Sequence, residues 1–208
     1  MPKFKNNNVS ISYEIYGTGK PVVLLHGGAV DFNNNYVQTG WVETLNRGGF
    51  QVIGINFRGY GESDKSNDPD FYGTANFSND VINLIKHLKF THVYLIGYSM
   101  GTVIAFDLLY NHSKYFSKAV LMATGNGLIG IPPFILGKYP PLTAQNATEI
   151  EIPTLIISGE MDLVLGKGEK VAQSLPQGKY LEIKNANHFE LATDTKVHQS
   201  TINFLIKD

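Results

Sequence analysis

The chain has 208 residues, of which 43% are hydrophobic and 17% are charged, and it contains no cysteine. This composition supports a full hydrophobic core and excludes disulfides, thiolate metal sites and a cysteine nucleophile. A formal net charge of −1 without runs of like charge argues against nucleic acid and anionic membranes as partners. Because no apolar signal core and no membrane-length apolar run occurs, we expect a cytoplasmic protein with one domain over residues 1–208.

Two kinds of apolar segment predict the strands of a sheet. Residues 9–17 alternate apolar and polar side chains, which predicts an antiparallel strand with one solvated face, near a sheet edge. The later segments are nearly continuous and rich in β-branched residues, as is typical of parallel strands covered on both faces. They span 21–27, 51–57, 92–99, 118–124 and 153–159, and 179–185 is the expected last strand.

Segments with helical spacing separate these strands. Residues 78–90 have one apolar face, with Ser78 as the expected N-cap, and residues 101–112 are apolar almost all round. A shorter helix is expected over 166–175, and an amphipathic C-terminal helix over 193–207. The alternation predicts an α/β fold, a mostly parallel twisted sheet with helices on both faces.

Residues 125–147 break this alternation. Four prolines and four glycines exclude an amphipathic helix of normal length there. We expect an irregular excursion over the sheet, a reduced lid that is too short to form a second domain.

The sequence Gly97-Tyr-Ser99-Met-Gly101 lies where a buried strand ends and a buried helix begins. Ligands of open α/β sheets bind beyond the carboxyl ends of the strands, and the following helix directs free backbone N–H groups to the same place. The flanking glycines relieve crowding around the serine in a sharp turn. Gly-x-Ser-x-Gly also occurs as a flexible turn without function, but its position here predicts that Ser99 is a nucleophile.

A serine nucleophile needs a general base, and the base needs an acid that orients it. Of the six histidines, only His26 and His188 follow predicted strand ends, and we assign His188 as the base. Asp162, just beyond the strand 153–159, is the predicted acid, and Glu160 is its rival. The chain order Ser, Asp, His is that of the nucleophile-elbow hydrolases.

Residues 24–30, LLHGGAV, lie at another strand end and carry two adjacent glycines that allow the backbone to approach a ligand closely. We predict that the N–H groups of Gly28 and Met100 bind a developing oxyanion. His26 is expected to brace this loop by hydrogen bonds and to take no part in proton transfer.

The segments VVLLHGG, NFRGYGESD, LIGYSMG, PTLIISGEMD and NANH together resemble the α/β-hydrolase fold superfamily over nearly the whole chain. These motifs are specific for the superfamily and poorly specific for substrate. The resemblance implies a Ser-His-Asp hydrolase, in which Arg58 orders the loop 57–64 by hydrogen bonds. Relatives often insert a helical cap at 125–147, so its near absence implies an open, shallow site with loose selectivity.

The expected reaction is hydrolysis of a small or medium carboxylic ester or thioester through an acyl-enzyme. A carbon–carbon bond hydrolase, a lyase or an acyltransferase on the same residues are alternatives, and so is a non-catalytic ligand-binding protein of this fold. Neither a metal nor a cofactor is expected, because the histidines lack metal-binding spacing and HGGAVDF is not a dinucleotide motif. The expected partner is therefore a small ester-like molecule.

An apolar substrate site is expected beside the serine. Its candidate lining residues are Phe32, Tyr98, Leu128 and Phe134. The sequence does not give the identity of the substrate or the oligomeric state.

Overall fold

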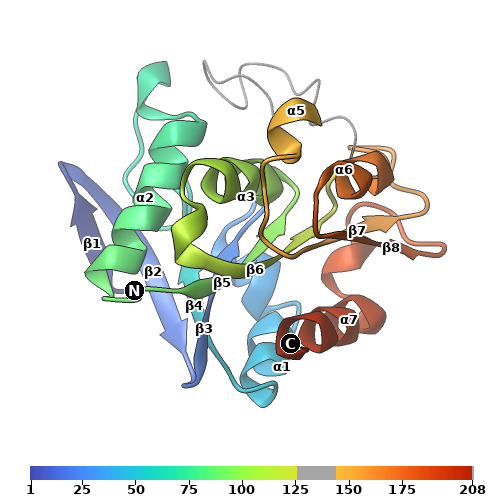
Figure 1. Cartoon of the computed structure of the whole chain (residues 1–208). Coiled ribbons are helices and arrows are strands. Elements are labelled where there is room, and N and C mark those ends of the chain that lie inside the picture. The colour runs from blue at the N-terminus through green and yellow to red at the C-terminus, as the bar shows by residue number, and fades with distance from the viewer. Residues whose placement is uncertain (126–143, 208) are drawn as a thin grey trace.

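An eight-stranded sheet organises the part of the chain that this computed structural model describes, residues 1–125 and 144–207 (Figure 1). The strands are β1 (Lys3–Asn6), β2 (Val9–Tyr16), β3 (Lys20–Leu25), β4 (Phe50–Ile55), β5 (Val93–Tyr98), β6 (Phe116–Met122), β7 (Thr154–Gly159) and β8 (Gly178–Ile183). Their order is β1-β2-β4-β3-β5-β6-β7-β8. The pairs β1–β2 and β2–β4 are antiparallel and all others are parallel, which confirms the predicted, mostly parallel α/β sheet.

Helices cover both faces of the sheet (Figure 1). They are α1 (Trp41–Arg47), α2 (Thr74–His87), α3 (Met100–Asn111), α5 (Ala144–Ala147), α6 (Glu169–Ser174) and α7 (Thr195–Ile206), with short turns of 3-10 or π type at Asn33–Val37, Pro69–Phe71, Ser113–Tyr115 and Glu190–Ala192. Two hydrophobic cores result. One joins α2, α3 and α6 to the sheet around Val81 and Ile104, and the other joins α1 and α7 to its opposite face around Trp41 and Leu205.

Three local features differ from the sequence prediction. Strand β1 and helix α1 were not predicted, and α2 begins four residues before the expected N-cap. Ser78 is therefore a buried residue inside α2, because Phe77 extends the apolar face of the helix and packs against Phe57, with 5.2 Å between the ring centroids. Helix α1 owes its position to tertiary contacts, since the indole N–H of Trp41 donates to the carbonyl of Ala192 at 2.8 Å.

Arg58 orders the loop after β4, as the resemblance implied. Its guanidinium forms a bidentate pair with the buried carboxylate of Asp80 on α2, at 2.7 and 2.8 Å, and donates to the carbonyl of Phe71 at 2.7 Å. Charge-assisted bidentate pairs of this kind are strong and directional, so the loop is tied to α2.

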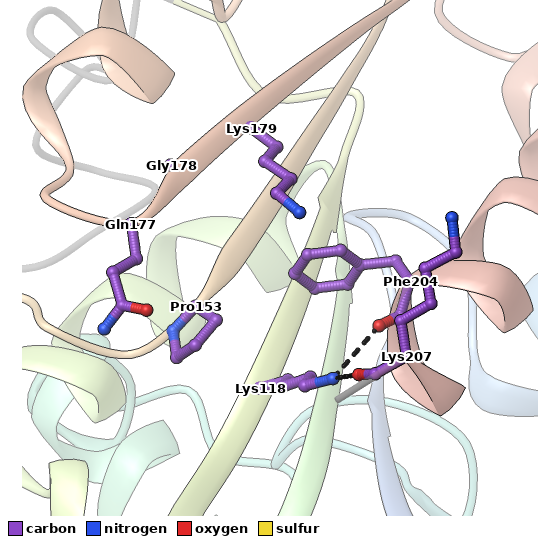
Figure 2. Close-up of a pocket in the computed structure, with 7 residues that line it drawn as sticks. All are labelled: Lys118, Pro153, Gln177, Gly178, Lys179, Phe204 and Lys207. Atoms are coloured by element: carbon purple, nitrogen blue, oxygen red, sulfur yellow. Dashed lines mark hydrogen bonds between the residues drawn. The ribbon is translucent and has the colours of Figure 1, made fainter.

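A cavity of about 340 Å³ lies at the amino ends of β6, β7 and β8 (Figure 2). Its lining residues are Lys118, Pro153, Gln177, Gly178, Lys179, Phe204 and Lys207. The ammonium groups of Lys118 and Lys179 lie 5.7 and 5.6 Å from the ring centroid of Phe204, and Lys118 also donates to the carbonyls of Phe204 and Lys207. These contacts hold the end of α7 against the sheet, at the edge opposite to the carboxyl ends where such folds bind ligands.

None of the helices in the described residues is long and apolar enough to cross a membrane.

Candidate active site

Ser99 connects β5 to α3 in a backbone conformation, φ 50° and ψ −115°, that residues other than glycine rarely adopt. Such a conformation costs on the order of 1–3 kcal/mol and persists only where its surroundings enforce it. The N–H of Ser99 donates to the carbonyl of Met122 on β6 at 3.0 Å. Its carbonyl accepts from both the N–H and the hydroxyl of Thr102, at 2.8 and 2.7 Å. The turn is thus held on both sides.

The two glycines of the motif allow β5 and α3 to approach this closely. A Cβ atom on Gly101 would lie 2.2 Å from the carbonyl oxygen of Leu25, and one on Gly97 would lie 2.9 Å from the carbonyl oxygen of Gly101. Both distances are shorter than a non-bonded contact allows, so any side chain at either position would push the helix away from the strand. The close packing leaves the partly exposed Ser99 at the carboxyl edge of the sheet.

The structure brings together the three residues predicted for proton transfer and nucleophilic attack. The Oγ atom of Ser99 lies 2.9 Å from Nε2 of His188, and Nδ1 of His188 lies 2.8 Å from Oδ2 of Asp162. Asp162 and His188 are each only 4% exposed, which shields their hydrogen bond from water. The side chains come from three different strand ends: β5, β7 and β8.

Of the two candidate acids, Asp162 contacts the histidine. Burial raises the pKa of Asp162, but hydrogen bonds from His188 and from the N–H groups of Leu165 and Val164 outweigh it and hold the pKa below its ordinary value. Asp162 is therefore a carboxylate at neutral pH. Glu160 instead accepts from Lys184 and from the N–H of Asn185, both at 3.0 Å.

Tyr98 lies against His188, the predicted base. Its hydroxyl donates to the backbone carbonyl of His188, and its ring meets the imidazole edge-on with 5.9 Å between the centroids. Tyr98 was predicted to line the substrate site, and its contact with His188 was not predicted, because the two residues are 90 positions apart and no local pattern connects them.

His26 braces the loop between β3 and α1, as predicted. Its Nδ1 atom lies 2.8 Å from the carbonyl of Gly27, and its Nε2 atom accepts from the N–H of Phe57 at 3.1 Å. Burial lowers the pKa of His26 to about 4, against a smaller opposing effect of the Gly27 hydrogen bond. The imidazole is therefore neutral at pH 7 and acts as a fixed link between two loops.

The loop of Gly27 and Gly28 lies next to the first turn of α3. The N–H of Gly27 is engaged, since it donates to the side chain of the buried Asn35 at 2.7 Å. A Cβ atom on Gly28 would lie 3.8 Å from Cβ of Met100, so the two residues predicted to bind an oxyanion are neighbours.

The predicted lining residues fall in three different places. Tyr98 is buried beside His188, as described above. Phe32 is fully buried, with its ring in the space that the missing side chain of Gly54 leaves open and beside the ring of Tyr36, so it belongs to the core and not to a surface that a substrate can reach. Leu128 and Phe134 lie outside the described residues.

Comparisons with known proteins agree with this architecture. A family model described as the alpha/beta hydrolase fold matches residues 20–144. The protein ABHD14A of Danio rerio is 28% identical over 191 residues, which cover 89% of this chain and 64% of that protein. The human serine hydrolase BPHL is 31% identical over 123 residues, which cover 55% of this chain and 40% of that protein.

The similarity to solved structures extends over the whole chain. The crystal structure of the enol-lactonase from Burkholderia xenovorans superposes with a TM-score of 0.85 at 19% identity, covering 99% of this chain and 100% of that one. At this identity the likeness concerns the fold. The chain spans less than two thirds of the length of the curated relatives it matches, with shares of 43, 37 and 64% for three of them.

Proposed function

This chain belongs to the alpha/beta hydrolase fold family, and within it we propose a serine hydrolase that cleaves small or medium carboxylic esters or thioesters. The observation that carries the proposal is the hydrogen-bonded path from Ser99 through His188 to Asp162 at the carboxyl edge of the sheet. Nucleophile, base and orienting acid are arranged as acyl transfer requires.

The reaction begins when Oγ of Ser99 attacks the substrate carbonyl carbon and its proton passes to Nε2 of His188. Asp162 accepts the hydrogen bond from Nδ1 and stabilises the imidazolium that forms. His188 then gives its proton to the leaving alcohol or thiol, and an acyl-enzyme remains on Ser99. Water repeats the cycle, releases the carboxylic acid and restores the serine.

We assign the oxyanion donors to the N–H groups of Gly28 and Met100. Met100 opens α3, where the first N–H groups of a helix have no carbonyl acceptor within the helix itself. On the opposite loop the N–H of Gly27 is already bound to Asn35, which leaves Gly28 as the donor from that side. Loss of one such donor typically lowers kcat by about 10²–10³.

The strain at Ser99 favours an enzyme over a ligand-binding protein of the same fold. Residues in unusual backbone conformations gather at functional sites, and here the strained residue is the one whose hydroxyl lies 2.9 Å from Nε2 of His188, the proposed base. A carbon–carbon bond hydrolase, a lyase or an acyltransferase on these three residues is distinguished by its products.

Covalent labelling tests the proposal. A fluorophosphonate should label the wild-type protein at Ser99 and should leave Ser99→Ala unlabelled. Ser117→Ala, which changes an exposed serine on β6, is the matched control and should be labelled like wild type. Turnover of short-chain nitrophenyl esters by Ser99→Ala should fall by about 10⁶, as for the equivalent change in subtilisin. Folded wild-type protein that takes up no label would favour the binding protein instead.

A further inference from the structure

Half of the large apolar side chains that are exposed in the described residues lie on the two loops that carry Asp162 and His188. They are Met161, Leu163, Val164 and Phe189, with exposed fractions of 54, 96, 58 and 73%. We call these four residues the apolar rim. Scattered apolar side chains are ordinary on protein surfaces, whereas several gathered round one site mark a binding surface.

The geometry of the Asp162 loop accounts for the outward position of its apolar side chains. Oδ1 of Asp162 accepts from the N–H groups of Val164 and Leu165, at 2.9 and 3.1 Å, so the polar backbone turns inward to the carboxylate. The N–H of Met161 donates to the carbonyl of Ala186 at 2.9 Å and joins this loop to the one that carries His188. The Asp162 loop, with three residues of the apolar rim, is thus held by bonds to the acid and to the His188 loop.

Phe189 extends the apolar rim to the base itself. Its ring meets the imidazole of His188 edge-on, with 5.3 Å between the centroids and an interplanar angle of 82°. Its N–H donates to the side chain of Asn187 at 2.9 Å, which fixes the backbone on which the ring stands. An exposed aromatic side chain therefore adjoins the group that protonates the leaving atom.

The charged side chains of these loops are engaged with one another or with the backbone. Lys184 binds both Glu160 and Glu182, at 3.0 and 2.7 Å, and Glu190 accepts from the N–H of Asn187 at 2.7 Å. A charged leaving group would have to compete with these partners for a counter-charge, whereas burial of an apolar group against the apolar rim removes apolar surface from water, which is favourable.

We propose that the apolar rim binds the alcohol part of the substrate, so that the preferred substrates are esters of apolar alkyl or aryl alcohols. The inference rests on the proposed function. When the bond between the acyl carbon and the alcohol oxygen breaks, Nε2 of His188 gives its proton to that oxygen, so the alcohol departs on the side of His188 and Phe189. The carbonyl oxygen points to the other side, toward Gly28 and Met100.

Two series of esters test the proposal. Only the alcohol varies in the first series, and only the acid varies in the second. In acetates of methyl, butyl, hexyl and benzyl alcohol, kcat/KM of the wild type should rise about tenfold from methyl to hexyl, which corresponds to partial burial of the added methylenes. The double variant Leu163→Ser, Phe189→Ser should lose most of this rise. In methyl esters of acids of increasing length, the same variant should keep the wild-type dependence on acyl length.

The control is Ile206→Ser, which removes an exposed apolar side chain at the end of α7 and should keep the wild-type hexyl-to-methyl ratio. Thermal unfolding of the double variant checks its fold, which should be preserved because both side chains are exposed. Equal hydrolysis of methyl and hexyl acetate by the wild type would overturn the assignment. A double variant in which only the dependence on acyl length changes would also overturn it. In both cases ester hydrolysis by Ser99 would still stand. Failure of the proposed function looks different, because no ester would then be hydrolysed and Ser99 would take up no fluorophosphonate.

Discussion

The hydroxyl of Tyr98 donates a hydrogen bond to the backbone carbonyl of His188, which joins the serine turn to the histidine loop. Burial, and secondarily the nearby Asp162, raise the pKa of Tyr98, so the phenol keeps its proton and remains a donor. The contact fixes the loop and not the imidazole nitrogens, which makes Tyr98 a positioning residue for the proposed base. Its ring also lies close to Gly27, where a Cβ atom would meet it at 3.2 Å.

Tyr98→Phe should lower kcat about tenfold with little change in KM, because the imidazole of His188 would lie in position to accept the Ser99 proton for a smaller fraction of the time. Tyr36→Phe is the matched control, since this buried hydroxyl also donates to a backbone carbonyl, that of Leu25 at 2.9 Å. Each variant should lose about 1 kcal/mol of unfolding free energy. Steady-state kinetics and urea unfolding separate the two effects, and equal kcat losses in both variants would show that Tyr98 acts through stability alone.

The assignment of the acid leads to a second prediction. Asp162→Asn should lower kcat by about 10⁴, as the equivalent change does in a serine protease, because an amide stabilises the wrong imidazole tautomer and no imidazolium. Glu160→Gln should stay within about twofold of wild type, since Glu160 lies in an exposed ion pair with Lys184. Nitrophenyl ester kinetics on both variants decide between the acids, and a reversed ranking would move the role to Glu160.

Apart from β1, the sequence was sufficient to predict the strands of the sheet, because buried parallel strands leave long apolar segments between helical ones. It was also sufficient to place Ser99, Asp162 and His188 at strand ends. Their hydrogen bonds, however, depend on strand order in space, which brings β5 and β8 residues together across the sheet. Helix α1 was not predicted because its position depends on the contact of Trp41 with Ala192, a residue far along the chain.

Side-chain burial was harder to predict than backbone position. Phe32 follows the glycine loop and is apolar, which suggested a substrate contact, but Gly54 on the neighbouring β4 opens a space that the ring fills. A one-dimensional pattern does not show which glycine lies beneath which aromatic ring. The exposure of the apolar rim was not predicted either, because it follows from the hydrogen bonds that turn the backbone of the Asp162 loop inward and not from a local pattern.

The glycines of the serine turn lead to a third prediction, on stability. Gly101→Ala should destabilise the fold by about 3 kcal/mol or more, because its Cβ would lie 2.2 Å from backbone that cannot move without separating α3 from β3. Gly28→Ala is the stability control, since its Cβ would meet only ordinary contacts at 3.8 Å. In urea unfolding followed by circular dichroism, Gly101→Ala should be less stable than Gly28→Ala. Equal stabilities would contradict the close packing of the turn at Ser99.

His26 leads to a fourth prediction, on the pH dependence of stability. The folded-state pKa of His26 is about 4, below the ordinary value of 6.5 that we expect in the unfolded chain. Between these values the unfolded state binds a proton that the folded state does not, so the free energy of unfolding falls as the pH falls from about 6.5 to about 4. The contribution of His26 to this fall should be about 3 kcal/mol.

The physical reason lies in the two bonds of the imidazole. With Nδ1 donating to the carbonyl of Gly27, Nε2 must be unprotonated to accept from the N–H of Phe57, and a second proton would set two donors against each other in a buried site. Burial also lowers the pKa of His112 and His198, whose contributions have the same sign. Urea unfolding between pH 4 and 7 on wild type and His26→Gln isolates the His26 part as the difference in slope. The same pH dependence in both proteins would contradict the lowered pKa of His26, because it would show that the imidazole binds its proton equally well in the folded and unfolded states.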